Sequence, residues 1–130
     1  MITPLVRFRI DFGTRCSVGP GKIALLEAIH RTGSLSQAAR DLGMSYRRAW
    51  QLASSLNASF HKTIVLLTRG GRGGGGAQLT SVGLDLISQY RTFEEAIQAR
   101  AERAFSGLSG KARKRSQSAA AAPIIRLSSR

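Results

Sequence analysis

The sequence predicts a mainly α-helical domain with a small β-hairpin, that is, a winged helix-turn-helix followed by a long C-terminal helix. Three observations predict this fold. Two short helical segments are separated by a tight turn that contains glycine, two strand-like segments follow them, and a basic, glycine-rich loop joins those strands. A helix-turn-helix followed directly by such a hairpin is typical of the winged form of this motif.

The N-terminal part predicts a strand and a first helix. Apolar and polar residues alternate from Leu5 to Phe12, as in a half-buried strand. The stretch Gly19-Pro20-Gly21 ends this pattern, and Pro20 favours the first turn of a helix. Gly33 is expected to end that helix, and His30 to be a partly buried structural residue. The residues at helical spacing are Ile23, Leu26, Ile29 and His30.

The next two helices predict the helix-turn-helix itself. Ser34 is a candidate N-cap, and Gln37, three residues later, completes a capping box. Gly43 ends this second helix, and Ser45 then caps a third helix that we expect from Tyr46 to about Ser59. Small apolar residues let the two helices approach closely; the apolar positions of the second helix are Leu35, Ala38, Ala39 and Leu42.

The third helix has two different faces. One face is apolar and should pack against the first two helices; it contains Ala49, Leu52, Ala53 and Leu56. The opposite face contains Tyr46, Arg47, Trp50, Gln51 and Ser54. These residue types suit the edges of DNA bases, since Arg pairs with guanine, Gln pairs with adenine, and aromatic rings pack on sugars or a thymine methyl. Two alternatives stay open: Trp50 is a core or interface residue, or Arg47 and Arg48 are only solvated.

A hairpin wing should follow, with strands at Ile64–Thr68 and Ala77–Thr80. The loop between them reads Arg69-Gly70-Gly71-Arg72-Gly73-Gly74-Gly75-Gly76. It is not a P-loop, because no Gly-Lys-Ser/Thr follows the glycines. A glycine-rich backbone can approach a phosphate closely, and Arg69 and Arg72 could reach phosphates or a minor groove. The alternative is a merely flexible hairpin tip.

A long helix is expected after Thr80, its N-cap, and should continue to about Phe105. Its apolar residues follow spacings of three and four, which is typical of a dimerisation stripe; they are Leu86, Tyr90, Phe93, Ile97, Ala101 and Ala104. A helix of about 26 residues extends roughly 39 Å, more than a small domain covers. We therefore expect a homodimer, with packing against the chain's own core as the alternative.

The domain organisation follows from composition. Residues 1–106 should form the winged domain, with the dimerisation helix at about 80–105. Residues 107–130 are rich in Ala and Ser and contain six basic and no acidic residues, which predicts a disordered tail.

Charge indicates the class of partner. The formal net charge is +13, and the segment from Arg40 to Arg72 has six basic residues against one acid, Asp41. A basic patch in an ordered region indicates a polyanion, and we expect double-stranded DNA. A membrane partner is not expected, because the longest aliphatic run, Ile64 to Leu67, falls far short of the roughly 20 residues of a span. The N-terminus lacks the apolar core of a secretion signal, and the single Cys16 cannot form an internal disulfide, so we expect a cytoplasmic, nucleoid-associated protein.

Nothing in the sequence predicts catalysis. His61 has no Cys, Asp or Glu at metal-ligand spacing, and the acidic residues show no pairing suited to acid/base chemistry. We therefore predict that the protein is not an enzyme and uses no metal and no cofactor.

Three segments together resemble the N-terminal DNA-binding domain of the molybdate-dependent transcriptional regulators of the ModE type. They are Gly33-Ser34-Leu35-Ser36-Gln37-Ala38-Ala39, Met44-Ser45-Tyr46-Arg47-Arg48-Ala49-Trp50, and Gly70 to Thr80. The first segment alone is shared with LysR-type regulators; the three in this order, within Leu5 to Phe105, are specific. The remaining predicted DNA-binding residues lie in these segments: Ser34, Ser36, Gln37, Ser45, Arg48 and Gly73.

The resemblance implies a dimer on a palindromic operator near genes of molybdenum uptake or use. Full-length members of this family continue into paired β-barrel modules that bind molybdate, whereas here a short basic tail follows Phe105. We therefore expect no molybdate binding within this chain. Two other functions are weighed against the regulator: a non-specific nucleoid-type architectural protein, which the charge would also allow, and a protein-interaction adaptor that uses the long helix.

Overall fold

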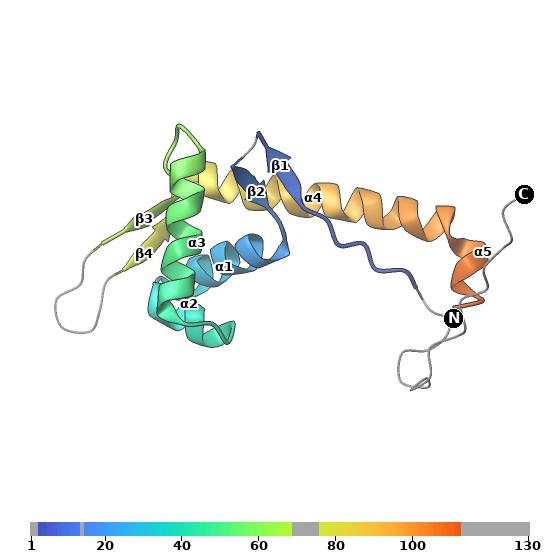
Figure 1. Ribbon diagram of the computed structural model, residues 1–130, viewed down its shortest axis with the longest axis horizontal. Coiled ribbons are helices and arrows are strands. Elements are labelled where there is room, and N and C mark those ends of the chain that lie inside the picture. Colours follow the sequence, from blue (N-terminus) through green and yellow to red (C-terminus); the bar gives the residue numbers. More distant parts are fainter. Residues whose placement is uncertain (1–2, 14, 69–75, 113–130) are drawn as a thin grey trace, which may run out of the picture. The chain divides into compact units, whose positions relative to one another are not determined.

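The computed structural model of the chain describes residues 3–13, 15–68 and 76–112 (Figure 1). The chain divides into two compact units, one from Arg7 to Ala96 and one that joins Met1–Val6 with Ile97–Arg130. The described part is mainly helical, with a small antiparallel strand pair after the helices, as the sequence predicts for a winged helix-turn-helix. None of its helices is long and apolar enough to cross a membrane.

The N-terminal hairpin consists of β1 (Ile10–Phe12) and β2 (Cys16–Val18), paired antiparallel with Ile10 opposite Val18. The predicted strand from Leu5 to Phe12 is therefore too long. Exposure alternates as expected from Leu5 to Asp11, but the apolar Phe12 is exposed. The ladder stops at Ile10 because its partner strand ends at Val18, where Gly19 becomes the N-cap of the first helix. The strand β2 has no counterpart among the elements predicted from sequence.

Three helices follow: α1 (Pro20–Thr32), α2 (Leu35–Asp41) and α3 (Tyr46–Ser59). Gly33 ends α1 with a φ of 69°, and its N–H donates to Ile29 O at 2.8 Å. This left-handed conformation favours glycine. The expectation for His30 is wrong, because this residue is exposed. It follows Ile29, the last buried residue of α1, and is turned away from the core by about 100° around the helix axis.

The wing strands are β3 (Val65–Leu67) and β4 (Ala77–Leu79), antiparallel with Leu66 opposite Gln78. The long helix α4 (Ser81–Ala104) comes next. As predicted, Thr80 caps it: its Oγ1 accepts from Gly83 N at 3.2 Å. A Cβ at Gly83 would lie 2.6 Å from Ile64 O, so the first turn of α4 packs directly on the backbone before β3.

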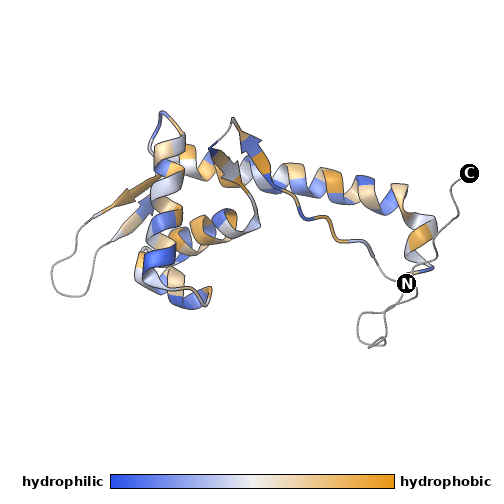
Figure 2. Cartoon of the chain, viewed as in Figure 1, coloured by the Kyte–Doolittle hydropathy of each residue, from blue (hydrophilic) through white to orange (hydrophobic). Residues whose placement is uncertain are grey.

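The core of the Arg7–Ala96 unit surrounds α1. Its fully buried large side chains are Val18, Ile23, Leu25, Leu26, Ile29, Leu56, Ile64 and Val65. Alanines complete it where α2 and α3 cross α1, at Ala38, Ala39, Ala49 and Ala53. Hydrophilic residues gather at the end of α3 nearest α2 (Figure 2).

In the other unit, Gln98 of α4 holds the N-terminal segment. Its Oε1 accepts from Val6 N at 2.9 Å, and its Nε2 donates to Pro4 O at 2.5 Å. A short helix, α5 (Ser106–Ser109), follows α4. It crosses the boundary that we predicted at residue 106, so ordered structure extends further than the composition indicated. Residues 113–130 of the predicted tail lie outside the described residues.

Candidate nucleic-acid interface

The exposed face of α3 is held in place by its cap and its core face. Ser45 Oγ accepts from Arg48 N at 3.0 Å, which begins the helix at Tyr46 as predicted. Ala49, Ala53 and Leu56 are buried and Leu52 is partly buried, so the apolar face packs as expected. The opposite face of the helix is therefore presented outward.

The predicted contact residues lie together on this outward face. Tyr46 is 55% exposed and Trp50 is 49% exposed, so Trp50 is not a core residue of this chain. Arg47, Arg48 and Gln51 are exposed as well, and Ser54 is half-buried. Within the described residues no acidic side chain pairs with Arg47 or Arg48. Both guanidinium groups are thus available to a polyanion.

At the N-terminus of α2, only half of the predicted capping box forms. Ser34 Oγ accepts from Gln37 N at 3.1 Å, as expected. The Gln37 side chain does not reach back, because its Nε2 donates to Asp41 Oδ1 at 2.8 Å and its Oε1 accepts from Arg40 at 3.2 Å. Thr32 Oγ1 takes the Ser34 N–H instead, at 3.3 Å.

Asp41 is the acidic residue of this surface, and its neighbours neutralise it. The hydrogen bond from Gln37, and next the hydrogen bond from Arg31 at 3.3 Å, hold the pKa of Asp41 below its ordinary value. Its charge is therefore satisfied within α1 and α2 rather than opposing an approaching phosphate. Ser36 and Gln37 are exposed on the same helix, and Ser34 is half-buried.

Asn57, which was not among the residues predicted from sequence, joins α3 to the wing. Its Oδ1 accepts from Ile64 N and Val65 N, both at 2.9 Å, and its Nδ2 donates to Val65 O at 2.8 Å. The only sequence signal is a polar residue beside the apolar face of α3. This side chain fixes the direction of β3 relative to the outward face of α3.

A second connection lies at the base of the wing. Thr68 Oγ1 accepts from Gly76 N at 2.9 Å and donates to Gly76 O at 3.1 Å. The next residue, Ala77, donates its N–H to Gly33 O at 3.0 Å, immediately before the Ser34 cap. The wing base therefore lies beside the N-terminus of α2. The predicted wing contacts Arg69, Arg72 and Gly73 lie outside the described residues.

The predicted dimerisation stripe is divided by the structure. Tyr90 is only 3% exposed: its ring stacks on Phe8 with centroids 4.5 Å apart, and its hydroxyl donates to Phe8 O at 2.9 Å. The assignment of Tyr90 to the interface is therefore wrong, because the N-terminal segment already covers it. Leu86 is partly buried against the core. The other stripe residues, Phe93, Ile97, Ala101 and Ala104, are half-buried or exposed.

No group of three or more His, Cys, Asp or Glu in the described residues could hold a metal ion. His61 is exposed.

Residues 21–84 match the family described as bacterial regulatory helix-turn-helix protein, lysR family. The chain carries a LysR-type regulatory helix-turn-helix domain. This LysR-type domain spans α1 to the first turn of α4, and so includes α2, α3 and the wing strands.

Curated relatives confirm the resemblance to ModE-type regulators. The chain is 42% identical over 84 residues to the molybdenum-pterin-binding protein MopB of Rhodobacter capsulatus, which covers 65% of the chain and 31% of that relative. It is 35% identical over 99 residues to the molybdenum transport protein ModE of Azotobacter vinelandii, a match that covers 76% of the chain and 37% of that relative. It is 44% identical over 71 residues to the DNA-binding transcriptional dual regulator ModE of Escherichia coli K12, a match that covers 55% of the chain and 27% of that relative. The chain thus spans about a third of the length of these relatives.

Proposed function

We propose that this protein is a sequence-specific transcription regulator that binds a palindromic DNA site as a homodimer and controls genes of molybdenum uptake or use. One observation carries the proposal: a LysR-type helix-turn-helix domain whose α3 presents Arg47, Trp50 and Gln51 outward, without an acidic partner among the described residues. Arginine and glutamine can each make two hydrogen bonds to one base in the major groove. We assign base contacts to this face and phosphate contacts to Ser34, Ser36 and Arg48.

The link to molybdenum rests on the relatives. The names of MopB and of the ModE of Azotobacter vinelandii refer to molybdenum, and both match the part of the chain that carries the domain. Similarity over the DNA-binding part supports related operators and related genes. That the chain itself binds no molybdate stays a prediction.

The homodimer is supported by apolar side chains that the chain itself leaves exposed. Phe93 of α4 is 48% exposed, and Leu84 and Phe12 are exposed as well. Phe12 and Phe93 line one groove together with Ile10 and Leu86, and a contiguous exposed apolar surface of this kind favours a protein–protein contact. A two-fold dimer would read two half-sites separated by a helical turn or a multiple of it, roughly 34–36 Å per turn.

Selection of preferred duplexes from a random DNA library tests the proposal. The full chain should enrich an inverted repeat, and it should bind the selected duplex on the order of 10³-fold or more tighter than random duplex. Reporter assays on genes next to matching genomic sites then test the molybdenum link. A library that shows no enrichment would overturn sequence-specific regulation.

One observation favours a second candidate, a non-specific architectural protein. The net charge of +13 would by itself produce strong, salt-dependent binding to any duplex. The same selection distinguishes the two, because an architectural protein would bind the library without enriching a sequence.

A further inference from the structure

We propose that a cleft between the β1–β2 hairpin, at Phe12, Arg15 and Cys16, and the C-terminal half of α3 binds a DNA backbone phosphate through Arg15 and Lys22. This inference deepens the proposed function and rests on it, because it requires a duplex against α3. Neither residue belongs to the helix-turn-helix contacts or to the wing. The contact would extend the interface to the N-terminal hairpin.

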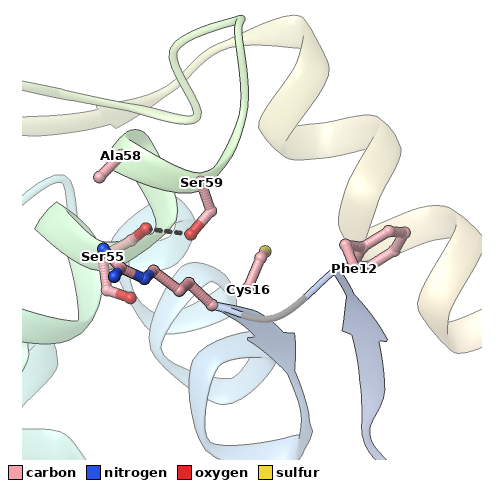
Figure 3. Close-up of a pocket in the computed structure, with 6 residues that line it drawn as sticks. Phe12, Cys16, Ser55, Ala58 and Ser59 are labelled. Carbon is pink, nitrogen blue, oxygen red and sulfur yellow. Dashed lines mark hydrogen bonds between the residues drawn. The ribbon is translucent and has the colours of Figure 1, made fainter.

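The cleft has a volume of about 480 Å³ and is lined by Phe12, Arg15, Cys16, Ser55, Ala58 and Ser59. Figure 3 shows Phe12 and Cys16 on the hairpin side and Ser55, Ala58 and Ser59 on α3. Ser59 Oγ donates to Ser55 O at 2.6 Å, so that hydroxyl hydrogen is used within the helix.

One cation lines the cleft, and a second reaches Ser55, another of its lining residues. Arg15 lines the cleft and is exposed. Lys22 reaches the same place from α1: its Nζ donates to Ser17 O at 2.7 Å and lies 3.4 Å from Ser55 Oγ. An ammonium group has three N–H donors, so one remains for a phosphate oxygen. The Ser55 hydroxyl, which accepts from Lys22, can donate its own hydrogen to the same group.

The surroundings of the cleft favour an anion. Among the described residues, no acidic side chain lines it. Asp11 of the same hairpin is engaged by Arg9, whose Nε lies 3.2 Å from the carboxylate. Within the described residues, neither Arg15 nor Lys22 forms an ion pair with an acidic side chain, so both positive charges remain available to an anion.

The position along α3 favours a phosphate rather than a base. Ser55 lies one turn beyond Gln51 and eight residues beyond Arg47, or about 12 Å along the axis at 1.5 Å per residue. The major groove is about 12 Å wide. When the N-terminal half of α3 lies at the base edges, this end of the helix is at the sugar-phosphate wall, within reach of long cationic side chains.

Salt dependence of DNA binding tests the proposal, with the full chain and the selected duplex. Arg15→Ala and Lys22→Met should each flatten the slope of log affinity against log salt by about 0.9. The factor by which DNA affinity falls between 50 and 200 mM salt should then be about 3.5-fold smaller than for the wild type. Base preference should not change, and Arg15→Lys, which keeps the charge, should keep the slope. In ethylation interference, one defined phosphate whose ethylation weakens binding of the wild type should no longer affect binding of Arg15→Ala.

The matched control is Arg7→Ala, which removes one exposed positive charge before β1, outside the cleft, and breaks no ion pair of the described residues. Arg15→Ala that behaves like Arg7→Ala would overturn the cleft assignment, while the proposed function would stand if Arg47→Ala still changes base preference. Loss of enrichment by the wild type would overturn both. Circular dichroism establishes that each variant is folded, and Arg15→Ala, whose side chain is exposed, decides the result if Lys22→Met unfolds.

A free tetrahedral oxyanion offers the same chemistry as a DNA phosphate. Calorimetric titration with inorganic phosphate and with molybdate, without DNA, distinguishes the two sources. Absence of micromolar binding supports the DNA assignment. Micromolar binding that is lost in Arg15→Ala would instead make the cleft a small-oxyanion site, and would also contradict the prediction that the chain binds no molybdate.

Discussion

Asn57 of α3 and Val65 of β3 are joined in both directions: the Asn57 amide donates to Val65 O at 2.8 Å and accepts from Val65 N at 2.9 Å. The same oxygen also accepts from Ile64 N at 2.9 Å. One side chain thus forms hydrogen bonds with three backbone groups where the chain turns from α3 into the wing. Since Ile64 and Val65 are buried, water cannot easily replace it.

Replacing Asn57 by Ala should therefore lower the free energy of unfolding by about 1–3 kcal/mol, because buried backbone groups lose their partners. Urea unfolding followed by circular dichroism measures this change. Asn57→Asp keeps an acceptor but loses the donor to Val65 O, so it should also destabilise. Ser54→Ala, on the outer side of the same helix, should stay within about 0.5 kcal/mol of the wild type. Equal stability of Asn57→Ala and Ser54→Ala would contradict the structural role of Asn57.

The outward face of α3 gives the second prediction. Arg47→Ala or Gln51→Ala should weaken binding to the selected duplex by about 1–3 kcal/mol if each side chain reads a base edge. Binding to random duplex should change less. Fluorescence anisotropy with both duplexes measures the difference, and Arg103→Ala, an exposed residue of α4, controls for lost charge. Equal losses on both duplexes would leave only a phosphate role for that position.

The wing base gives the third prediction. Thr68→Val keeps the shape of the side chain but removes the hydroxyl that bonds both backbone groups of Gly76. We expect the free energy of unfolding to fall by about 0.5–1.5 kcal/mol. Hydrogen exchange at the Gly76 amide, measured by NMR, should become faster. Thr68→Ser, which keeps the hydroxyl, should retain slow exchange. If Thr68→Val exchanges as slowly as the wild type, the backbone pairing alone holds the wing base.

The helix caps of this fold could be predicted from sequence, whereas the hydrogen bonds between residues far apart in the chain could not. The caps Ser34, Ser45 and Thr80 depend on residues at most three positions away, so a short window contains the whole interaction. Gln37 shows the limit of such a rule: a capping-box pattern was present, but Asp41 and Arg40 compete for the side chain.

Asn57 and Tyr90 depend on partners that spacing does not reveal. The acceptor of the Tyr90 hydroxyl is the carbonyl of Phe8, 82 residues earlier in the chain. Helical periodicity placed Tyr90 correctly on the apolar side of α4 but could not distinguish an intrachain partner from a second copy. The cleft at Arg15 was missed for the same reason, since it requires β2, a strand too short for a periodic pattern.

Tyr90 gives a prediction on pH dependence. Burial, and next the negative charge of Glu94, raise the pKa of Tyr90 above its ordinary value of 10.0. With a raised pKa in the folded state, the contribution of Tyr90 to stability is full below pH 10.0 and is lost as pH rises through the folded-state pKa.

The comparison is with Tyr90→Phe, which keeps the ring stack on Phe8 but loses the hydroxyl. At about pH 8 the wild type should be more stable by about 0.5–1.5 kcal/mol, and the difference should shrink or reverse by about pH 11. Urea unfolding at both pH values measures it. A difference that does not change with pH would mean that the Tyr90 hydroxyl does not titrate within this range.

The dimer gives the last prediction. Phe93→Glu and Ile97→Glu each place a charge on the side of α4 that we propose pairs with a second copy. An unpaired charge is costly in an apolar contact, so each variant should be monomeric in sedimentation experiments. Binding to the selected palindrome should weaken strongly, whereas binding to an isolated half-site should change little. Phe93 also lies edge-on against Phe8, with ring centroids 5.4 Å apart, so the thermal midpoint of Phe93→Glu must be compared with that of Ile97→Glu. Ser88→Glu, an exposed position elsewhere on α4, adds the same charge and should remain dimeric. A wild-type chain that sediments as a monomer at micromolar concentration would contradict the homodimer, and α3 would then read a single half-site.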